Sequence, residues 1–194
     1  ILNAWDIEGV RFAEPKLKIM GIEAVKSSTP APCRTMIKDA LKLIMGGTED
    51  DVINYIDKMR SDFKKMDPSL IAFPRSCNNV DKYHSNFSIY SKGTPIHVRG
   101  ALLHNHYVKK NVLESKYSYI NNGDKIKFCY LSKPNPIREN VISFMGELPT
   151  ELGLNQYIDY TLMFDKSFVE PLKAVLDAIG WSVERHATLE SFFT

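Results

Sequence analysis

Apolar residues follow two different periods in the first third of the chain. In residues 1–20 the runs "WDI" and "VRF" flank Glu8-Gly9, and alternation on both sides of such a pair predicts a β-hairpin. Beyond residue 28 the apolar positions recur every three or four residues, which is the period of an amphipathic helix. Capping and stop signals then predict helices over 30–46 and 49–66. These two helices are expected to form a helical hairpin.

The rest of the chain is less regular. Residues 68–96 contain proline, glycine and an asparagine pair that break any period, so irregular structure is expected there. A short helix weakened by Gly100 is predicted over 97–109, and the runs "KIKFCYL" and "ENVISFMG" predict two strands. The last pattern predicts a long helix from about Asn155 to Ile179, kinked or split at Pro171. The predicted fold class is α+β: a β-hairpin, a helical hairpin, a small irregular β region and a long C-terminal helix.

Composition excludes several classes of protein. The chain has 194 residues, of which 44% are hydrophobic, so it can bury a core. It has no run of 18 apolar residues and no signal peptide at its start, and no membrane association is expected. The three cysteines, Cys33, Cys77 and Cys129, never occur in C-x-x-C spacing. They predict reduced thiols in a cytoplasm and argue against a zinc knuckle.

Charge is unevenly distributed along the chain. Residues 67–136 carry 10 Lys and Arg against 4 Asp and Glu, an excess of six positive charges. Residues 137–194 carry 4 against 9, an excess of five negative charges. One interpretation is that the basic segment faces a polyanion, and the other is that both segments are solvated surfaces.

Motifs of common enzymes are missing. The sequence contains no G-x-S-x-G, no phosphate-binding G-x-x-x-x-G-K-[ST] and no G-x-G-x-x-G. His104 and His106 form H-x-H with His97 nearby, but on a helix the two side chains of H-x-H diverge by about 200°. A zinc site is therefore not expected. A hydrolase with His97, His104 or His106 as general base remains a rival hypothesis, which the missing nucleophile and carboxylate cluster disfavour.

Four stretches of the chain resemble the family B DNA polymerases of T-even-like bacteriophages, in the right order. The run "WDIEGVRFAEPKLKIMGIEAVKSSTP" (5–30) resembles the segment that closes the palm and enters the thumb of those polymerases. The run "TPIHVRGALLHNHY" (94–107) is similar to their thumb motif, and "DYTLMFDKSFVEPL" (159–172) is similar to their last long helix. The final "ATLESFFT" resembles their clamp-docking tail.

This resemblance implies a domain organisation and a function. Residues 1–26 would be the C-terminal end of the palm, 27–184 the thumb and 185–194 a tail that binds a sliding clamp. The chain would be the C-terminal fragment of a replicative DNA polymerase, a nucleotidyltransferase that acts in the cytoplasm of the infected bacterial host. The catalytic aspartates, the exonuclease and the fingers would lie upstream. Magnesium is expected in the complete polymerase, and this chain alone is not expected to polymerise.

The family thumb grips primer-template duplex, which implies contacts with the phosphate backbone. The side chains matched to such contacts are cationic groups or a histidine suited to phosphate oxygens. They are Lys26, Lys92, His97, Arg99 and Lys166, with Lys16 and Lys18 as weaker candidates. Glu170 stands where some relatives carry a lysine, one turn after Lys166, which implies a weaker grip by the late helix.

The end of the chain has its own pattern. Leu189, Phe192 and Phe193 form L-x-x-F-F, which in a short helical turn presents one aliphatic and two aromatic groups to a hydrophobic pocket. The resemblance implies that this pocket belongs to the sliding clamp. Folding of the two phenylalanines back onto the thumb is the alternative.

A second hypothesis of another class stays open at this point. The chain could be a freestanding non-enzymatic DNA-binding or clamp-associated regulator, with the same basic segment and the same tail. Binding of primer-template by a natural product that begins with its own methionine would favour it.

Overall fold

Two compact units make up the chain. The computed structural model describes residues 2–7, 10–21, 24 and 26–185, and of residues 2–7 and 12–17 it describes the backbone alone. The first unit comprises Ile1–Lys65 and Phe164–Thr194, and the second comprises Met66–Met163. The predicted α+β class is confirmed, since helices alternate with two small antiparallel sheets along the chain. The predicted palm, thumb and tail boundaries stay predictions.

The chain starts with the expected hairpin. Strand β1 (Leu2–Ile7) pairs antiparallel with β2 (Val10–Lys18), with Leu2 opposite Lys18 and Ile7 opposite Val10. The register shifts between Ala4 and Asp6. A sheet of two strands is marginally stable by itself in water, so this hairpin is an element that gains from a partner surface.

Helices α1 (Ala31–Gly46) and α2 (Glu49–Phe63) confirm the predicted helical hairpin. Their local signals explain where they start, because a proline precedes α1 and Thr48 forms a capping box with Asp51 at α2. Each helix buries one apolar face. The buried residues are Cys33, Met36, Ile37, Ala40 and Leu41 on α1, and Val52, Ile53, Ile56 and Phe63 on α2.

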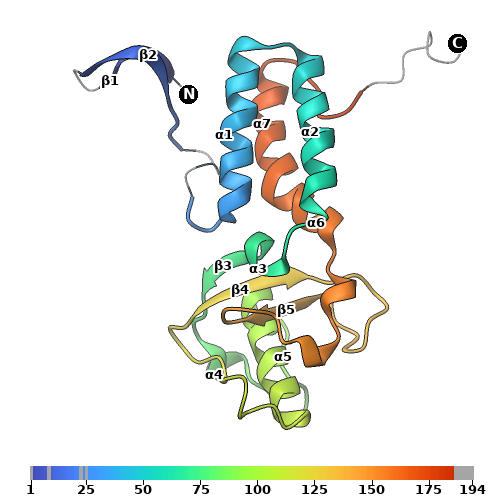
Figure 1. Cartoon of the computed structure of the whole chain (residues 1–194). Helices are drawn as coiled ribbons and strands as arrows, with labels where there is room; N and C mark the ends of the chain where they lie inside the picture. The colour runs from blue at the N-terminus through green and yellow to red at the C-terminus, as the bar shows by residue number, and fades with distance from the viewer. Residues whose placement is uncertain (1, 8–9, 22–23, 25, 186–194) are drawn as a thin grey trace, which may run out of the picture. The chain divides into compact units, whose positions relative to one another are not determined.

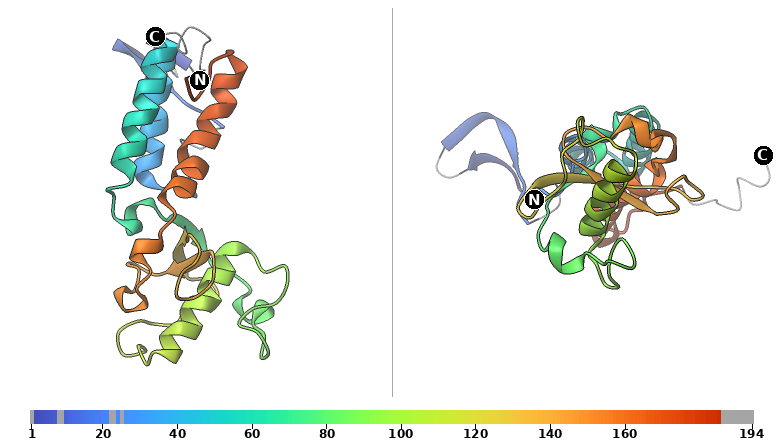
Figure 2. Two further views of the ribbon diagram at one scale, coloured as in Figure 1. Left: turned by 90° about the vertical axis from the view of Figure 1, so that its right-hand side faces the viewer. Right: turned by 90° about the horizontal axis from the view of Figure 1, so that it is seen from below.

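From Phe164 onward the late helical segment belongs to the first unit. Helix α6 (Tyr160–Phe164) continues through a π-helical turn, η4 (Asp165–Val169), into α7 (Glu170–Ala178). Figures 1 and 2 show α1, α2 and α7 side by side. Phe164 lies at the centre of an aromatic cluster, with ring centroids 5.2 Å from Phe63 and 5.1 Å from Phe168. The cysteine Cys33 is buried in this unit and donates its S–H to Ser167 at 3.2 Å.

Two details of the predicted late helix need correction. The helix begins at Tyr160 rather than near Asn155, because Asn155–Tyr157 form a 3-10 turn and Ile158 makes a β-bridge to Leu131. The expected break at Pro171 appears as the π-helical turn directly before it. There the N–H of Glu170 bonds the carbonyl of Asp165, five residues back.

The second unit is built on a three-stranded antiparallel sheet with the order β3-β4-β5. The strands are β3 (Phe73–Ser76), β4 (Lys125–Tyr130) and β5 (Val141–Phe144), with Phe73 opposite Phe128 and Phe128 opposite Ser143. The predicted strands around "KIKFCYL" and "ENVISFMG" are thus confirmed. Figure 1 shows α5 (Ile96–Lys110) lying across this sheet.

Gly100 makes the contact between helix and sheet possible. A Cβ atom at this position would lie 2.4 Å from Ser143 Oγ and 2.7 Å from the Ser143 backbone nitrogen. The helix predicted over 97–109 is confirmed, and the structure adds a packing reason for the glycine that costs it helix propensity. The helix is 15 residues long, and its glycine lets α5 approach β5 more closely than any side chain would permit.

Residues 68–96 are more ordered than expected. They contain α3 (Pro68–Ile71), strand β3, α4 (Val80–Tyr83) and a β-bridge between His84 and Tyr90. Periodicity misses β3 because its stabilising partner, β4, lies some fifty residues further along the chain. Pro74 is tolerated in β3 because this is an edge strand, where a missing N–H costs no ladder bond.

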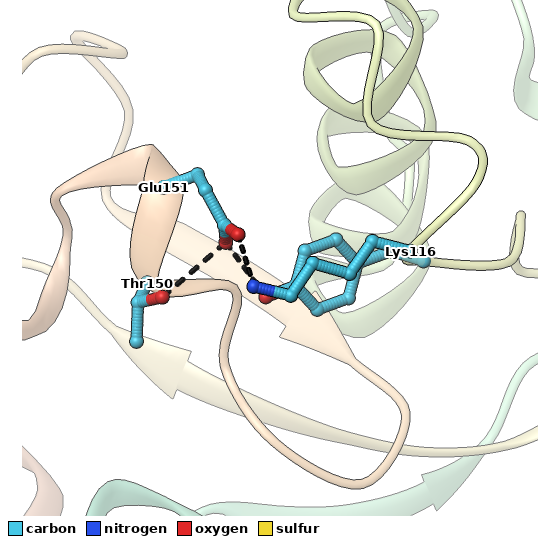
Figure 3. A network of polar contacts seen from close by, with 4 residues as sticks. Lys116, Thr150 and Glu151 are labelled. Carbon is cyan, nitrogen blue, oxygen red and sulfur yellow. Dashed lines mark hydrogen bonds and ion pairs between the residues drawn. The ribbon is translucent and has the colours of Figure 1, made fainter.

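Polar contacts join two exposed segments of the second unit. Glu151 lies in the 3-10 turn η2 (Thr150–Leu152), where it accepts hydrogen bonds from Lys116 Nζ and, at 2.6 Å, from the Tyr117 hydroxyl (Figure 3). The hydrogen bonds from Lys116 and Tyr117 lower the pKa of Glu151 to about 2. Its ionised form is therefore favoured by folding.

Replacing this carboxylate should cost stability only where it is ionised. We expect Glu151→Gln to lower the thermal unfolding midpoint at neutral pH. Because the folded-state pKa lies below the ordinary value of 4.5, the stabilisation is complete above about 4.5 and is lost as the pH falls toward 2. The measurement is the midpoint of wild type and variant across that range, with the exposed Glu147→Gln as control. A difference that persisted at pH 2 would contradict the role assigned to the charge.

No helix in the described part of the chain is long and apolar enough to cross a membrane. All three cysteines are buried and free, in agreement with the thiols expected from their spacing.

Candidate nucleic-acid interface

The motif over residues 94–107 covers most of α5 (Ile96–Lys110), and its His97 and Arg99 lie in the first turn of this helix. Pro95 precedes this helix, no side chain caps it, and its first turn contains no acidic residue. The first N–H groups of such a helix lack intrahelical partners, and the helix dipole makes this end positive. His97 and Arg99 therefore stand at a helix end whose electrostatics favour an anion.

Arg75 joins His97 at this end of the helix. The ring centroid of Phe128 lies 5.7 Å from Arg75 Cζ and 6.4 Å from the His97 ring, so both side chains lie against one aromatic residue of β4. Burial, and secondarily the positive charge of Arg75, lowers the pKa of His97 below its ordinary value. At neutral pH His97 is thus an uncharged hydrogen-bonding group, while Arg75 supplies the positive charge.

Sequence reasoning missed Arg75. Its strand β3 fell in the stretch expected to be irregular, and only pairing with β4 brings Arg75 to the start of α5. The signal available in the sequence was the short run "AFPRS", in which an aromatic residue and an arginine are two residues apart and hence on one face of a strand.

Arg99 is engaged within the second unit. Its Nη2 donates to Asn140 Oδ1 at 2.5 Å, and its guanidinium lies 5.6 Å from the centroid of the Tyr90 ring. The Tyr90 hydroxyl in turn donates to Glu139 at 2.6 Å. The bond to Asn140 uses one of five guanidinium donors. Arg99 therefore connects α5 to the segment before β5, whatever else it contacts, and its contact with phosphate stays a prediction.

The predicted lysines lie in both units. Lys92 is exposed in the loop that leads to α5, and Lys26 is exposed shortly before α1. Lys18 ends β2 and is partly exposed, and Lys16 pairs opposite Ala4 in the same hairpin, where only its backbone is described.

Lys166 has an acidic neighbour one turn away. Its Nζ lies 3.5 Å from Glu170 Oε1, an i,i+4 ion pair across the π-helical turn. This pair gives a structural reason for the expectation that the late helix holds DNA less firmly, because Glu170 offsets the charge of Lys166.

The charge asymmetry of the sequence is weaker in the folded units. The acidic residues of 137–163 fold into the same unit as the basic segment, which then carries 11 Lys and Arg against 8 Asp and Glu in residues 66–163. The excess of this unit is three positive charges rather than the six of residues 67–136. Local placement, as at Arg75, therefore matters more than the regional count.

The three histidines of α5 have different surroundings. His104 is buried with Nε2 3.2 Å from the Ser118 carbonyl oxygen, and burial lowers its pKa. The His106 ring lies edge-on to Tyr107 at 5.0 Å, and burial lowers its pKa as well. The hydrolase hypothesis, which assigns one of these histidines as general base, is not tested by this arrangement.

Metal binding has no counterpart in the described part of the chain. In residues 2–7, 10–21, 24 and 26–185, no group of three or more His, Cys, Asp or Glu side chains is placed to hold an ion. Magnesium was expected in the complete polymerase rather than in this chain, and that expectation stays a prediction. Leu189, Phe192 and Phe193 of the predicted clamp-binding tail lie outside the described residues.

Two phage proteins are similar to this chain along nearly its whole length. The chain is 31% identical over 196 aligned positions to the DNA-directed DNA polymerase of Enterobacteria phage T4, and 32% identical over 196 positions to that of Escherichia phage RB69. Each match covers 99% of this chain and 21% of the relative, so the chain spans about a fifth of the length of these polymerases. No protein-family model matches it. The expected resemblance is thereby confirmed: the chain is similar to the DNA-directed DNA polymerases of these two phages.

Proposed function

We propose that this chain is the part of a phage-type DNA polymerase that holds primer-template duplex while nucleotidyl transfer takes place in other parts of the enzyme. The observation that carries the proposal is the similarity to two DNA-directed DNA polymerases over 99% of the chain. The catalytic aspartates, their magnesium ions, the exonuclease and the fingers would be supplied by the remaining polymerase. The place of action would be the infected bacterial host.

Arg75 and His97 are the residues on which this grip most depends in the second unit. Both lie against Phe128 at a helix start that favours an anion, and a phosphate there would meet one fixed charge and one hydrogen-bonding ring. Such contacts position a duplex without reading its sequence. Arg99 would support them by holding α5 to Asn140, and Lys26, Lys92 and Lys166 would add further phosphate contacts.

The tail would attach this grip to a sliding clamp through Leu189, Phe192 and Phe193. Burial of one phenylalanine is worth about 1.5–3 kcal/mol before ordering costs, so the tail alone would bind weakly. Tethering to protein already bound on DNA would raise its effective concentration and make the contact useful.

Salt dependence of duplex binding tests the grip. The chain should bind labelled primer-template duplex with little sequence preference, and log affinity should fall with log salt by about 0.9 per neutralised phosphate. We expect Arg75→Ala to reduce that slope by about one unit. Arg75 is chosen as the probe because it lies with His97 against the Phe128 ring. Both arginines also make contacts within the fold, Arg75 with the Pro74 carbonyl at 2.8 Å and Arg99 with Asn140.

Lys42→Ala is the matched control for Arg75→Ala. Lys42 is an exposed cation of α1 paired with Asp39, and its loss should leave the slope unchanged. Equal slopes for wild type and Arg75→Ala would remove Arg75 from the interface. Failure of the wild-type chain to bind duplex would refute the grip itself. Binding together with no stimulation of the remaining polymerase would favour the freestanding regulator.

A further inference from the structure

The second unit contains a groove that none of the proposed duplex contacts uses. It has a volume of about 860 Å³ and lies among α4, the loop 84–90, the second half of α5 and the loop before β4. Its lining includes Phe87, Tyr119, His84, His106 and Lys109. Lys109 and His97 are twelve residues apart on one helix, which separates them by about 18 Å along its axis. The groove is therefore a different place from the Arg75 and His97 contact.

Phe87 is the most unusual side chain of this groove. It is fully exposed, at 104% of the reference area, although a large aromatic group normally gains from burial. The loop that carries it is braced, because His84 and Tyr90 form a β-bridge and the Ser85 hydroxyl accepts hydrogen bonds from the backbone N–H groups of Phe87 and Ser88. An aromatic ring is thus held out toward solvent by a defined turn.

The opposite walls are also held in place by hydrogen bonds. Asn105 on α5 bonds the backbone of Ile120 in both directions, donating to its carbonyl at 2.8 Å and accepting from its N–H at 2.7 Å. Asn122 accepts from the N–H of Val80 at 2.7 Å and donates to Asp81. A groove with such walls loses little conformational freedom when a ligand enters.

Charge indicates the kind of ligand. The ionisable side chains that line the groove are His84, His106, Lys109 and Tyr119 together with one carboxylate, Asp81. That carboxylate already accepts a hydrogen bond from Asn122. Lys82 and Lys110 are adjacent in the sequence to lining residues. A lysine combined with an exposed aromatic ring is the chemistry that binds unpaired bases and their phosphates, and in the lining of the groove these are Lys109 and Phe87.

We propose that this groove binds single-stranded DNA, with an unpaired base stacked on Phe87 and a backbone phosphate at Lys109. Bases inside a duplex are already stacked on their neighbours, so they offer no free face on which the Phe87 ring could stack. The site therefore discriminates single strands from the duplex that the Arg75 and His97 contact would hold. In a polymerase it would retain a strand that is not paired, which goes beyond a grip on duplex product.

Anisotropy with labelled oligothymidylate and with labelled duplex tests this proposal. We expect Phe87→Ala to weaken binding of oligothymidylate about fivefold or more, the loss typical of one stacked base, and to leave duplex affinity unchanged. Leu70→Ala, another exposed apolar residue of the second unit, is the matched control. Lys109→Ala should lower the salt slope on oligothymidylate by about 0.7, and Lys42→Ala should not change it.

Phe87→Trp provides a direct readout of stacking. It should keep the affinity for oligothymidylate, and the fluorescence it adds should be quenched by the oligonucleotide. Unchanged single-strand affinity in Phe87→Ala, absence of quenching, or an equal loss of duplex affinity would each overturn the proposal and leave the groove to a peptide or a second copy of the chain. If the wild-type chain bound oligothymidylate but did not bind duplex, the duplex grip alone would be refuted.

Discussion

Gly100→Ala is expected to destabilise the second unit by about 3 kcal/mol or more, at or beyond the upper end of the usual cost of overpacking. The new Cβ would lie 2.7 Å from the Ser143 nitrogen and 3.0 Å from the Ile142 carbonyl carbon, and these are backbone atoms of β5 that cannot turn away. Alanine gains about 1 kcal/mol of helix propensity over glycine. The clash outweighs that gain, so α5 must separate from the sheet.

Hydrogen exchange of the α5 amides measures this effect, because both tryptophans, Trp5 and Trp181, belong to the first unit and do not report on α5. The matched control is Gly46→Ala at the end of α1, where nothing lies within 4 Å of the added Cβ. Protection of α5 should fall in Gly100→Ala and stay unchanged in Gly46→Ala. Since α5 carries His97 at one end and Lys109 at the other, duplex and single-strand binding should weaken together. If the α5 amides kept full protection in Gly100→Ala, β5 would have to move and make room for the added Cβ, and the expected destabilisation would be contradicted.

Phe164→Ala is expected to lower the free energy of unfolding of the first unit by about 3–5 kcal/mol. The Phe164 ring is 1% exposed and contacts the rings of Phe63 and Phe168. The Arg60 guanidinium lies 5.0 Å from the centroid of the Phe164 ring. The same guanidinium forms an ion pair with Asp165 at 3.1 Å. Removal of the ring leaves a cavity and takes away the surface on which Arg60 lies.

Urea unfolding followed by tryptophan fluorescence is the suitable measurement, because it reports on the first unit. Phe87→Ala makes the same chemical change at a fully exposed position and should alter the free energy of unfolding by no more than about 0.5 kcal/mol. If Phe164→Ala and Phe87→Ala gave equal unfolding curves, the cluster of Phe63, Phe164 and Phe168 would not be the core of the first unit. Hydrogen exchange of the α5 amides, which lie in the same unit as Phe87, shows whether the expected loss of single-strand binding in Phe87→Ala is a loss of fold.

The candidate interface was predictable in part. His97 and Arg99 come from a contiguous motif, and the resemblance to phage polymerases identifies that motif from the sequence. Arg75 was not predictable, because no local pattern connects it to a helix that starts twenty residues later. The groove at Phe87 was not predictable either, since its walls come from four segments between residues 80 and 122. An exposed phenylalanine becomes a candidate contact only when its surroundings are known.

Local sequence alone determined the elements whose signals are local. The helical hairpin of α1 and α2 followed from capping residues and a repeated apolar face, and β4 and β5 followed from short apolar runs. The tertiary structure alone decided what depends on distant partners: that Gly100 is a contact point with Ser143, that Phe73–Ser76 is a strand, and that Arg75 lies beside His97. The physical reason is that a cap or an amphipathic period acts within a few residues. A strand pairing, a close approach or a shared charge exists only after distant segments have packed.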